Sequence, residues 1–97
     1  MIFVVYILEC ADKTLYVGST NDLRRRLHQH NTAKAGAHYT KIRRPVTLKY
    51  FEEYETKSES LKREVALKKL SRVEKLALIA TLDTRKFDDY VQGSDTE

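Results

Sequence analysis

Alternating hydrophobic and polar positions mark three stretches of this chain as strands. The runs 2–9 and 14–19 are rich in β-branched and aromatic residues, and the turn expected at 11–13 would join them into an antiparallel hairpin. A third run with the same two-residue period covers 46–54. These patterns predict a small sheet with most of its residues near the N-terminus.

Segments with helical periodicity follow the hairpin and the third strand. The first helix is expected over 22–32, with Asn21 or Asp22 as its N-cap. Two more are expected over 57–70 and 72–82, because each follows a capping-box sequence in which Ser or Thr precedes Glu by three residues. The stripe Val73, Leu76, Ala77 and Ala80 is the face of the last helix expected to pack inward.

The order of elements is therefore β-β-α-β-α-α, which is typical of an α+β domain. A basic loop, 33–45, separates the first helix from the third strand, and loops of this length are often functional. We expect one domain over 1–82 and an acidic C-terminal tail over 83–97 that either docks in part or stays disordered.

Composition narrows the class of protein. The chain has 97 residues, enough for one modest core. Its one cysteine, Cys10, cannot form an internal disulfide, which favours a cytoplasmic protein. The apolar run 2–8 is much shorter than the roughly 20 residues needed to span a bilayer, so we expect no membrane partner.

Charge is distributed unevenly. The net charge is +4, but the segment 83–97 carries five acidic and two basic residues, which leaves +7 on 1–82. A compact basic body favours a polyanion such as DNA as partner. Many small basic domains bind no nucleic acid, so charge alone does not decide the function.

Two tyrosines ten positions apart, Tyr6 and Tyr16, are the first candidates for chemistry. If the hairpin loop has three residues, Tyr6 lies opposite Gly18 and both phenols share one face of the sheet, whereas an even-numbered loop would place them on opposite faces. We expect Gly18 to leave open space for a ligand beside Tyr6. The alternative is that both tyrosines only pack the sheet.

The first helix carries three consecutive arginines. Helical geometry turns Arg26 and His30 toward the sheet and turns Arg24 and Arg25 toward water. An inward arginine needs an anion, and a phosphate would supply one. Alternatively, the Arg26 stem only passes the edge of the core.

The next helix carries a carboxylate, Glu64, inside the apolar arc between Leu61 and Leu67. Such a group is costly to bury unless it is paired or binds a metal. Lys68, four residues later, offers an ordinary ion pair. One carboxylate suits one Mg²⁺ that also bridges to a substrate phosphate. The sequence has neither a close Cys/His cluster for zinc nor a glycine-rich phosphate loop with a lysine.

Taken together, these motifs resemble the GIY-YIG nuclease superfamily, and in particular its small single-domain bacterial members. The resemblance rests on two tripeptides ten residues apart, on a basic helix and on the later glutamate segment, and it covers roughly residues 2–80. The matching segments are Val5-Tyr6-Ile7, Tyr16-Val17-Gly18, 21–30 and 61–70.

The resemblance implies a three-stranded antiparallel sheet flanked by helices, and hydrolysis of DNA phosphodiesters with one Mg²⁺ or Mn²⁺ ion. Carried over by position, it implies that Glu64 is the metal ligand and that the other catalytic residues are Tyr6, Tyr16, Arg26 and His30. This chain has Val4-Val5 where Gly-Ile is usual, and Ser19 where the repair nucleases of the family have a lysine. The late asparagine of the family has no match in 81–97.

We therefore expect a weakly sequence-selective, metal-dependent DNA endonuclease without a small-molecule cofactor. One alternative is a non-catalytic nucleic-acid-binding domain with the same fold. Another is a protein-interaction module whose acidic tail docks on its basic body. The expected DNA contacts outside the catalytic residues are Lys34, His38, Lys41, Arg43, Arg44 and Lys68.

Overall fold

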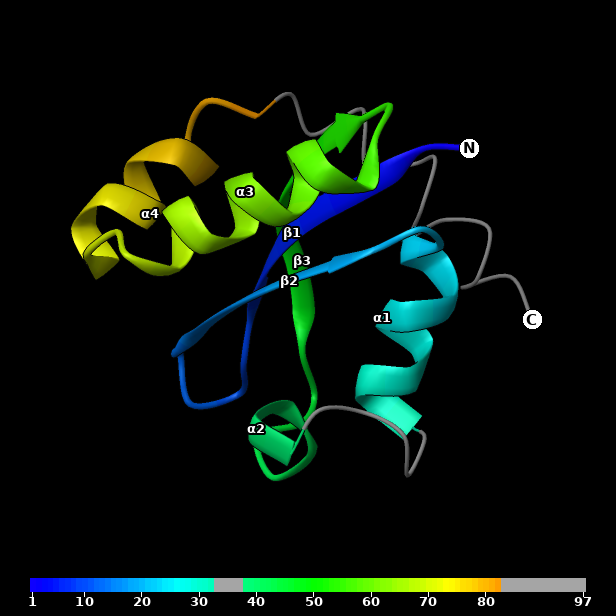
Figure 1. The fold of residues 1–97 in the computed structure, drawn as a ribbon. Helices are drawn as coiled ribbons and strands as arrows, with labels where there is room; N and C mark the ends of the chain where they lie inside the picture. Colours follow the sequence, from blue (N-terminus) through cyan, green and yellow to red (C-terminus); the bar gives the residue numbers. More distant parts are fainter. Residues whose placement is uncertain (33–37, 83–97) are drawn as a thin grey trace.

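A computed structural model describes residues 1–32 and 38–82, so the predicted acidic tail lies outside the described residues. Three strands form one antiparallel sheet with the order β2-β1-β3 (Figure 1). They are β1 (Phe3–Glu9), β2 (Leu15–Thr20) and β3 (Thr47–Tyr54). The predicted three-stranded sheet is confirmed, and β2 lies at one edge of it.

The turn between β1 and β2 sets the register of this edge. It has three residues, 11–13, and Lys13 takes a left-handed φ of 72°. Tyr6 then lies opposite Gly18, and Tyr16 lies two positions before Gly18 on the same face. The structure thus confirms the three-residue alternative.

Four helices complete the described chain. They are α1 (Leu23–Thr32), α2 (His38–Lys41), α3 (Lys57–Lys68) and α4 (Arg72–Ile79). The order β-β-α-β-α-α is confirmed, with α2 as one added helical turn inside the segment 33–45, which was expected to be a loop. No helix in the described part of the chain is long and apolar enough to cross a membrane.

The helix starts follow the expected capping chemistry. Asp22 is the N-cap of α1, since its Oδ1 accepts a hydrogen bond from the Arg25 amide at 3.2 Å. Thr56 caps α3 through its side-chain oxygen. Ser71 and Glu74 form a complete capping box at α4.

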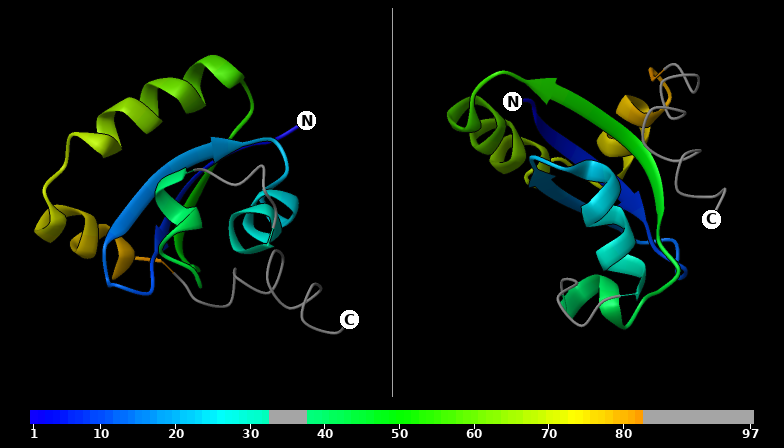
Figure 2. Two further views of the ribbon diagram at one scale, coloured as in Figure 1. Left: turned by 90° about the horizontal axis from the view of Figure 1, so that it is seen from below. Right: turned by 90° about the vertical axis from the view of Figure 1, so that its right-hand side faces the viewer.

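Helices cover both faces of the sheet (Figure 2). In the left panel the sheet lies between α3 on one side and α1 and α2 on the other. Because side chains alternate along each strand, the sheet contributes to a separate core on each face. The core under α1 includes Val4, Tyr6, Leu8, Leu23 and Phe51, and the core under α3 includes Val5, Ile7, Val17, Tyr50 and Leu67.

The inward face of α4 differs from the expected stripe. Val73 and Leu76 are 76% and 40% exposed. Leu78, Ile79 and Leu82 pack against the core under α3 instead. The expected stripe was wrong because α4 ends early, at Ile79, and meets the sheet with its C-terminal half.

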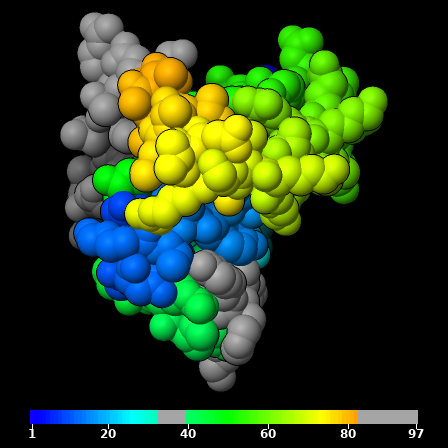
Figure 3. Space-filling view, turned by 90° about the vertical axis from the view of Figure 1, so that its left-hand side faces the viewer, coloured from blue at the N-terminus to red at the C-terminus, as the bar shows by residue number. Residues whose placement is uncertain are grey.

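The N-terminal end of α4 lies against the hairpin. The Arg72 guanidinium donates a hydrogen bond to the Lys13 carbonyl oxygen at 2.6 Å. Figure 3 shows α4 in yellow directly beside the blue hairpin. This contact directs the first turn of α4 toward the hairpin and leaves Val73 facing solvent.

The packing of α4 predicts different costs for two matched truncations. Leu78→Ala should lower the free energy of unfolding by about 2 kcal/mol, because it removes a partly buried side chain from the core. Leu76→Ala should cost less than about 1 kcal/mol. Urea unfolding of both variants measures the difference, and equal losses would contradict the observed face of α4.

Candidate active site on both faces of the edge strand

A buried hydrogen-bonded chain links three elements on the α1 side of the sheet. The Tyr6 hydroxyl lies 2.8 Å from His30 Nε2, and His30 Nδ1 lies 2.7 Å from Thr40 Oγ1. Tyr6 is 1% exposed, and His30 and Thr40 are fully buried. These hydrogen bonds therefore link β1 to α1 and α2 through one imidazole ring.

Burial keeps the two titratable groups of this hydrogen-bonded chain, Tyr6 and His30, in their neutral forms. It raises the pKa of the Tyr6 phenol, with a further increase from Tyr16, while a hydrogen bond from Arg26 opposes the shift. Burial, followed by the charges of Arg26 and Arg44, lowers the pKa of His30 to about 4. At neutral pH the protein thus holds an uncharged phenol against an uncharged imidazole.

Tyr16 joins the same cluster from the edge strand. Its ring meets His30 edge-on, with centroids 5.3 Å apart and planes at 66°. Tyr6 meets the same ring at 5.8 Å and 70°. The two phenols thus lie around one imidazole, and Tyr16 is the less buried of the two.

The space beside Gly18 is already filled. A Cβ atom at Gly18 would lie 2.5 Å from the Tyr6 hydroxyl oxygen, closer than real contacts allow. The glycine therefore makes room for the phenol of Tyr6. The expectation that Gly18 leaves open space for a ligand was wrong, because the opposite side chain occupies that space.

The arginines of α1 divide as helical geometry predicts. Arg24 and Arg25 are exposed, whereas Arg26 is partly buried beside the tyrosine cluster. The Arg26 Nη1 atom donates to Gln29 Oε1 at 3.1 Å. The guanidinium is a planar group of several donors, a shape that matches the oxygens of an anionic ligand.

Glu64 faces the opposite side of β2. Its Oε1 accepts a hydrogen bond from Ser19 Oγ at 2.7 Å, and its Oε2 lies 2.9 Å from Lys68 Nζ. Partial burial favours a higher pKa, but the hydrogen bonds from Lys68 and Ser19 hold the pKa of the Glu64 carboxyl below its usual value. Glu64 is therefore a partly buried carboxylate at neutral pH.

The two groups of residues lie on opposite faces of one edge strand. Tyr16 and Gly18 point to the α1 side of β2, and Ser19 points to the α3 side. No strand pairs with the outer edge of β2 in the described sheet. Because Gly18 and Ser19 are adjacent in sequence, the two groups are separated by a single strand.

One metal ion fits this arrangement if substrate supplies other ligands. Within residues 1–32 and 38–82 there is no cluster of three or more His, Cys, Asp or Glu side chains that would hold a metal by itself. Glu64 offers one ionised carboxylate, and its Lys68 partner is 53% exposed and can move aside. Mg²⁺ suits such a site, because it keeps several waters and accepts phosphate oxygens.

The expected DNA contacts have different surroundings. The Arg43 Nε atom pairs with Asp12 Oδ2 at 3.0 Å. The Arg44 guanidinium donates to the carbonyl oxygens of His30 and Gln29 and so caps the end of α1. Lys41 is exposed and Lys68 pairs with Glu64, while the side chains of Lys34 and His38 lie outside the described part of the chain.

Comparison with known families shows which family the chain belongs to. The family model described as the GIY-YIG catalytic domain matches residues 2–77. The chain belongs to the GIY-YIG family. The resemblance read from the sequence is therefore confirmed over most of the chain.

Relatives of this GIY-YIG chain include small bacterial proteins named only as UPF0213. One from Syntrophus aciditrophicus is 57% identical over 75 residues, covering 77% of this chain and 86% of the relative. One from Staphylococcus aureus is 53% identical over 75 residues and covers 77% of this chain and 90% of the relative. Their names state no activity.

Two solved structures share the fold. The solution NMR structure of a UPF0213 protein from Bacillus halodurans is 39% identical, with a TM-score of 0.54, and covers 82% of this chain and 84% of that one. The solution NMR structure of an E. faecalis protein is 41% identical, with a TM-score of 0.59, and covers 84% and 85%.

Two residues of the candidate site were given no role in the sequence analysis. The contact of Thr40 with His30 was missed, because it spans ten residues and depends on how α2 packs against α1. Ser19 had a signal that could have found it. Side chains alternate along β2, so Ser19 lies on the other face of the strand from Tyr16 and Gly18. Glu64 lies on that face too.

The neutral state of His30 predicts how stability depends on pH. In the unfolded chain His30 takes up a proton below about pH 6.5, whereas in the fold it does so only near pH 4. Stability should therefore fall by about 2 kcal/mol between pH 7 and pH 5. Urea unfolding at both pH values measures this loss.

Two histidine variants separate this effect from general acid sensitivity. His30→Gln should be less stable at pH 7 but should lose much less stability on going to pH 5. His28→Gln, at an exposed position of the same helix, should keep the wild-type dependence. A wild-type stability that does not change from pH 7 to pH 5 would rule out a buried neutral His30.

Thr40 should hold the His30 ring through its hydroxyl. Thr40→Val keeps the shape but leaves a buried ring nitrogen without this partner, so we expect a loss of about 1–3 kcal/mol in unfolding free energy. It should also change the ¹⁵N chemical shifts of the His30 ring. Thr40→Ser retains the hydroxyl and should keep the wild-type ring shifts. Identical ring shifts in all three proteins would show that Thr40 only fills space.

Proposed function

We propose that this protein is a divalent-metal-dependent endonuclease that hydrolyses phosphodiester bonds in DNA with weak sequence selectivity. One observation carries the proposal. An ionised carboxylate, Glu64, lies on one face of the edge strand β2, and a cluster of candidate catalytic side chains lies on the other face. The cluster consists of Tyr6, Tyr16, Arg26 and His30. The GIY-YIG family match and the net charge of +4 support the same substrate class.

The protein groups would divide the work by charge and burial. Arg26 would hold a non-bridging phosphate oxygen with its planar guanidinium and stabilise charge that develops in the transition state. Tyr16, the less buried phenol, would orient the attacking water. The raised pKa of Tyr6 suits a positioning role rather than that of a proton acceptor in the free protein.

Glu64 would hold the metal together with substrate phosphate and water. Ser19 fixes one oxygen of this carboxylate, and Lys68 would leave the other when substrate arrives. When bound, Mg²⁺ or Mn²⁺ supplies a Lewis acid that offsets negative charge on the phosphate and on the leaving oxygen. The lowered pKa of Glu64 keeps this ligand ionised over the working range of pH.

A non-catalytic DNA-binding domain is the second candidate. The observation that favours it is the pairing of both Glu64 oxygens within the protein, since a structural ion pair has the same appearance. Metal dependence of cleavage separates the two candidates. Both would bind DNA in a salt-dependent manner.

We further propose that the protein works in the cytoplasm. The one thiol, Cys10, is free and buried in the core. A free thiol is typical of proteins from reducing compartments.

Removal of the carboxylate should abolish cleavage without unfolding the protein. Glu64→Ala should reduce Mg²⁺-dependent nicking of supercoiled plasmid by about 100-fold or more, because the metal loses its protein ligand. The melting temperature should change little, since a partly exposed ion pair contributes at most about 1 kcal/mol. Glu55→Ala, at an exposed position, is the matched control. Full activity in Glu64→Ala would remove Glu64 from the site.

The arginines of α1 should differ in what they change. Arg26→Ala should lower the turnover of bound DNA by about 100-fold, because it removes a donor aimed at the reacting phosphate. Arg24→Ala and Arg25→Ala should leave that turnover within about threefold of wild type. Single-turnover cleavage at saturating protein measures this step. Similar, modest losses in all three variants would reduce the helix to a general phosphate-binding surface.

A further inference from the structure

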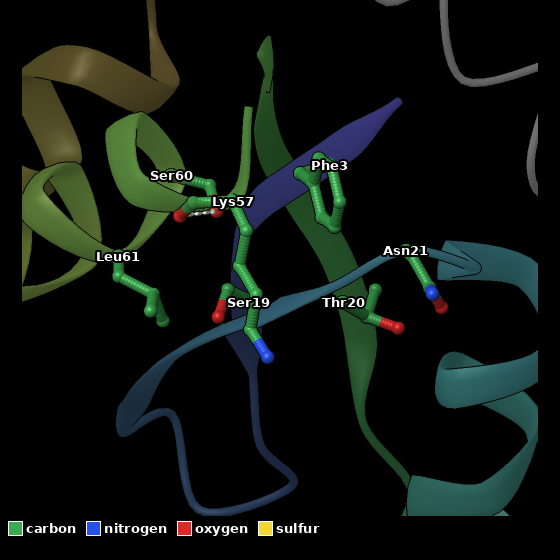
Figure 4. Close-up of a pocket in the computed structure, with 7 residues that line it drawn as sticks. All are labelled: Phe3, Ser19, Thr20, Asn21, Lys57, Ser60 and Leu61. Atoms are coloured by element: carbon green, nitrogen blue, oxygen red, sulfur yellow. Dashed lines mark hydrogen bonds between the residues drawn. The ribbon is translucent and has the colours of Figure 1, made fainter. Parts of the chain in front are cut away.

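Two pockets lie on either side of the junction between β2 and α1. One, on the α3 side, has a volume of about 270 Å³ and extends from Phe3 to Lys57 (Figure 4). The other, of about 180 Å³, is lined by Arg25 and Arg26 of α1. Both are lined in part by Thr20 and Asn21, at the C-terminal end of the edge strand, so the two pockets adjoin there.

Lys57 supplies the positive charge of the larger pocket. In Figure 4 its side chain reaches from α3 toward Ser19 and Thr20 on β2. Among the described residues no carboxylate forms a salt bridge with Lys57, so its charge is available to a ligand. Lys57 lies seven residues, or two turns, before Glu64 on the same face of α3, which places them about 10 Å apart along the helix axis.

The same pocket also has apolar walls. The Phe3 ring lines one side, and Leu61, which is 43% exposed, lines another. The pocket is also lined by residues with hydroxyl or amide side chains, namely Ser19, Thr20, Asn21 and Ser60. A cation, polar side chains and an apolar wall together match a sugar–phosphate unit, which has an anionic group beside an apolar sugar face.

The smaller pocket has a net positive charge on the α1 side, since Arg25 and Arg26 line it together with the single carboxylate of Asp22. Arg25 is exposed and lines this pocket, although helical geometry turns it away from the sheet. Arg26 lies deeper, beside the tyrosine cluster. The reacting phosphate proposed above would contact Arg26 at the inner wall of this pocket, and Arg25 and Lys57 would lie on either side of it.

We propose that the two pockets form a binding track for the sugar–phosphate backbone of the strand that is cut. Lys57 holds a phosphate on one side of the cleaved bond, with the adjoining sugar against Phe3, and Arg25 holds a phosphate on the other side. The track rests on the proposed function for its substrate, and it assigns two flanking phosphate contacts to residues outside the catalytic cluster.

Matched charge removals test the track through binding alone. A fluorescein-labelled DNA oligonucleotide is titrated with protein in EDTA, so that no cleavage interferes, at 50 and 200 mM salt. Lys57→Ala and Arg25→Ala should each weaken binding by about fivefold at the lower salt and reduce the slope of log K against log salt by about 1. Lys62→Ala and Arg24→Ala remove the same charge from exposed positions outside the pockets and should change affinity by less than about twofold.

Neutral methylphosphonate linkages locate the contacts when they are placed one at a time in a short oligonucleotide whose cleavage position has first been mapped with wild-type protein and Mg²⁺. Wild-type protein should lose affinity at linkages on both sides of the cleavage position. Lys57→Ala should become insensitive to the linkage on one side, and Arg25→Ala to the linkage on the other. Melting curves establish that each variant is folded.

Binding and cleavage by the wild-type protein distinguish a wrong binding track from a wrong proposed function. If the wild-type protein binds and cuts DNA but the Lys57 and Lys62 variants bind equally well, the track is wrong and the nuclease assignment stands. If the wild-type protein does not bind DNA at either salt concentration, both proposals fall.

Discussion

The hydrogen bonds of the buried His30 ring fix the geometry on which the rest of the site depends. One nitrogen contacts the Tyr6 hydroxyl and the other contacts Thr40, so three elements that are distant in sequence meet at one imidazole. A ring that is fully buried and neutral cannot lose either partner without leaving a polar atom unsatisfied. The Tyr6 side chain, held in this way, leaves room only for glycine at position 18. Tyr16 packs against the His30 ring as well.

A second network sets the position of Glu64 from the other face. Arg63, its neighbour on α3, forms two hydrogen bonds with Glu52 of β3, at 2.8 and 3.0 Å. Tyr50 and Tyr54 also donate to this carboxylate, and burial together with Glu52 raises the pKa of each phenol to about 12. Because this bidentate pair fixes the rotation of α3 against the sheet, Glu64 is directed toward the edge strand.

Local sequence patterns predicted most of the fold, and they predicted the strand register beside the site. Period-two and helical repeats located the strands and the helix starts, and the register that pairs Tyr6 with Gly18 followed from a three-residue turn. Long-range packing decided what remained. The inward face of α4, the contact of Thr40 with His30 and the filled space at Gly18 all depend on which elements meet, and residues near in sequence carry no signal for that.

We expect the tyrosine–His30 cluster and Glu64 to act on one substrate from opposite faces of β2. An NMR titration of ¹⁵N-labelled protein with a non-cleavable DNA oligonucleotide and Mg²⁺ tests this claim most directly. The account predicts that amide signals of Tyr16 and Arg26 on one face, and of Ser19 and Glu64 on the other, shift together with one dissociation constant. Shifts confined to one face of the strand, or two separate dissociation constants, would contradict it.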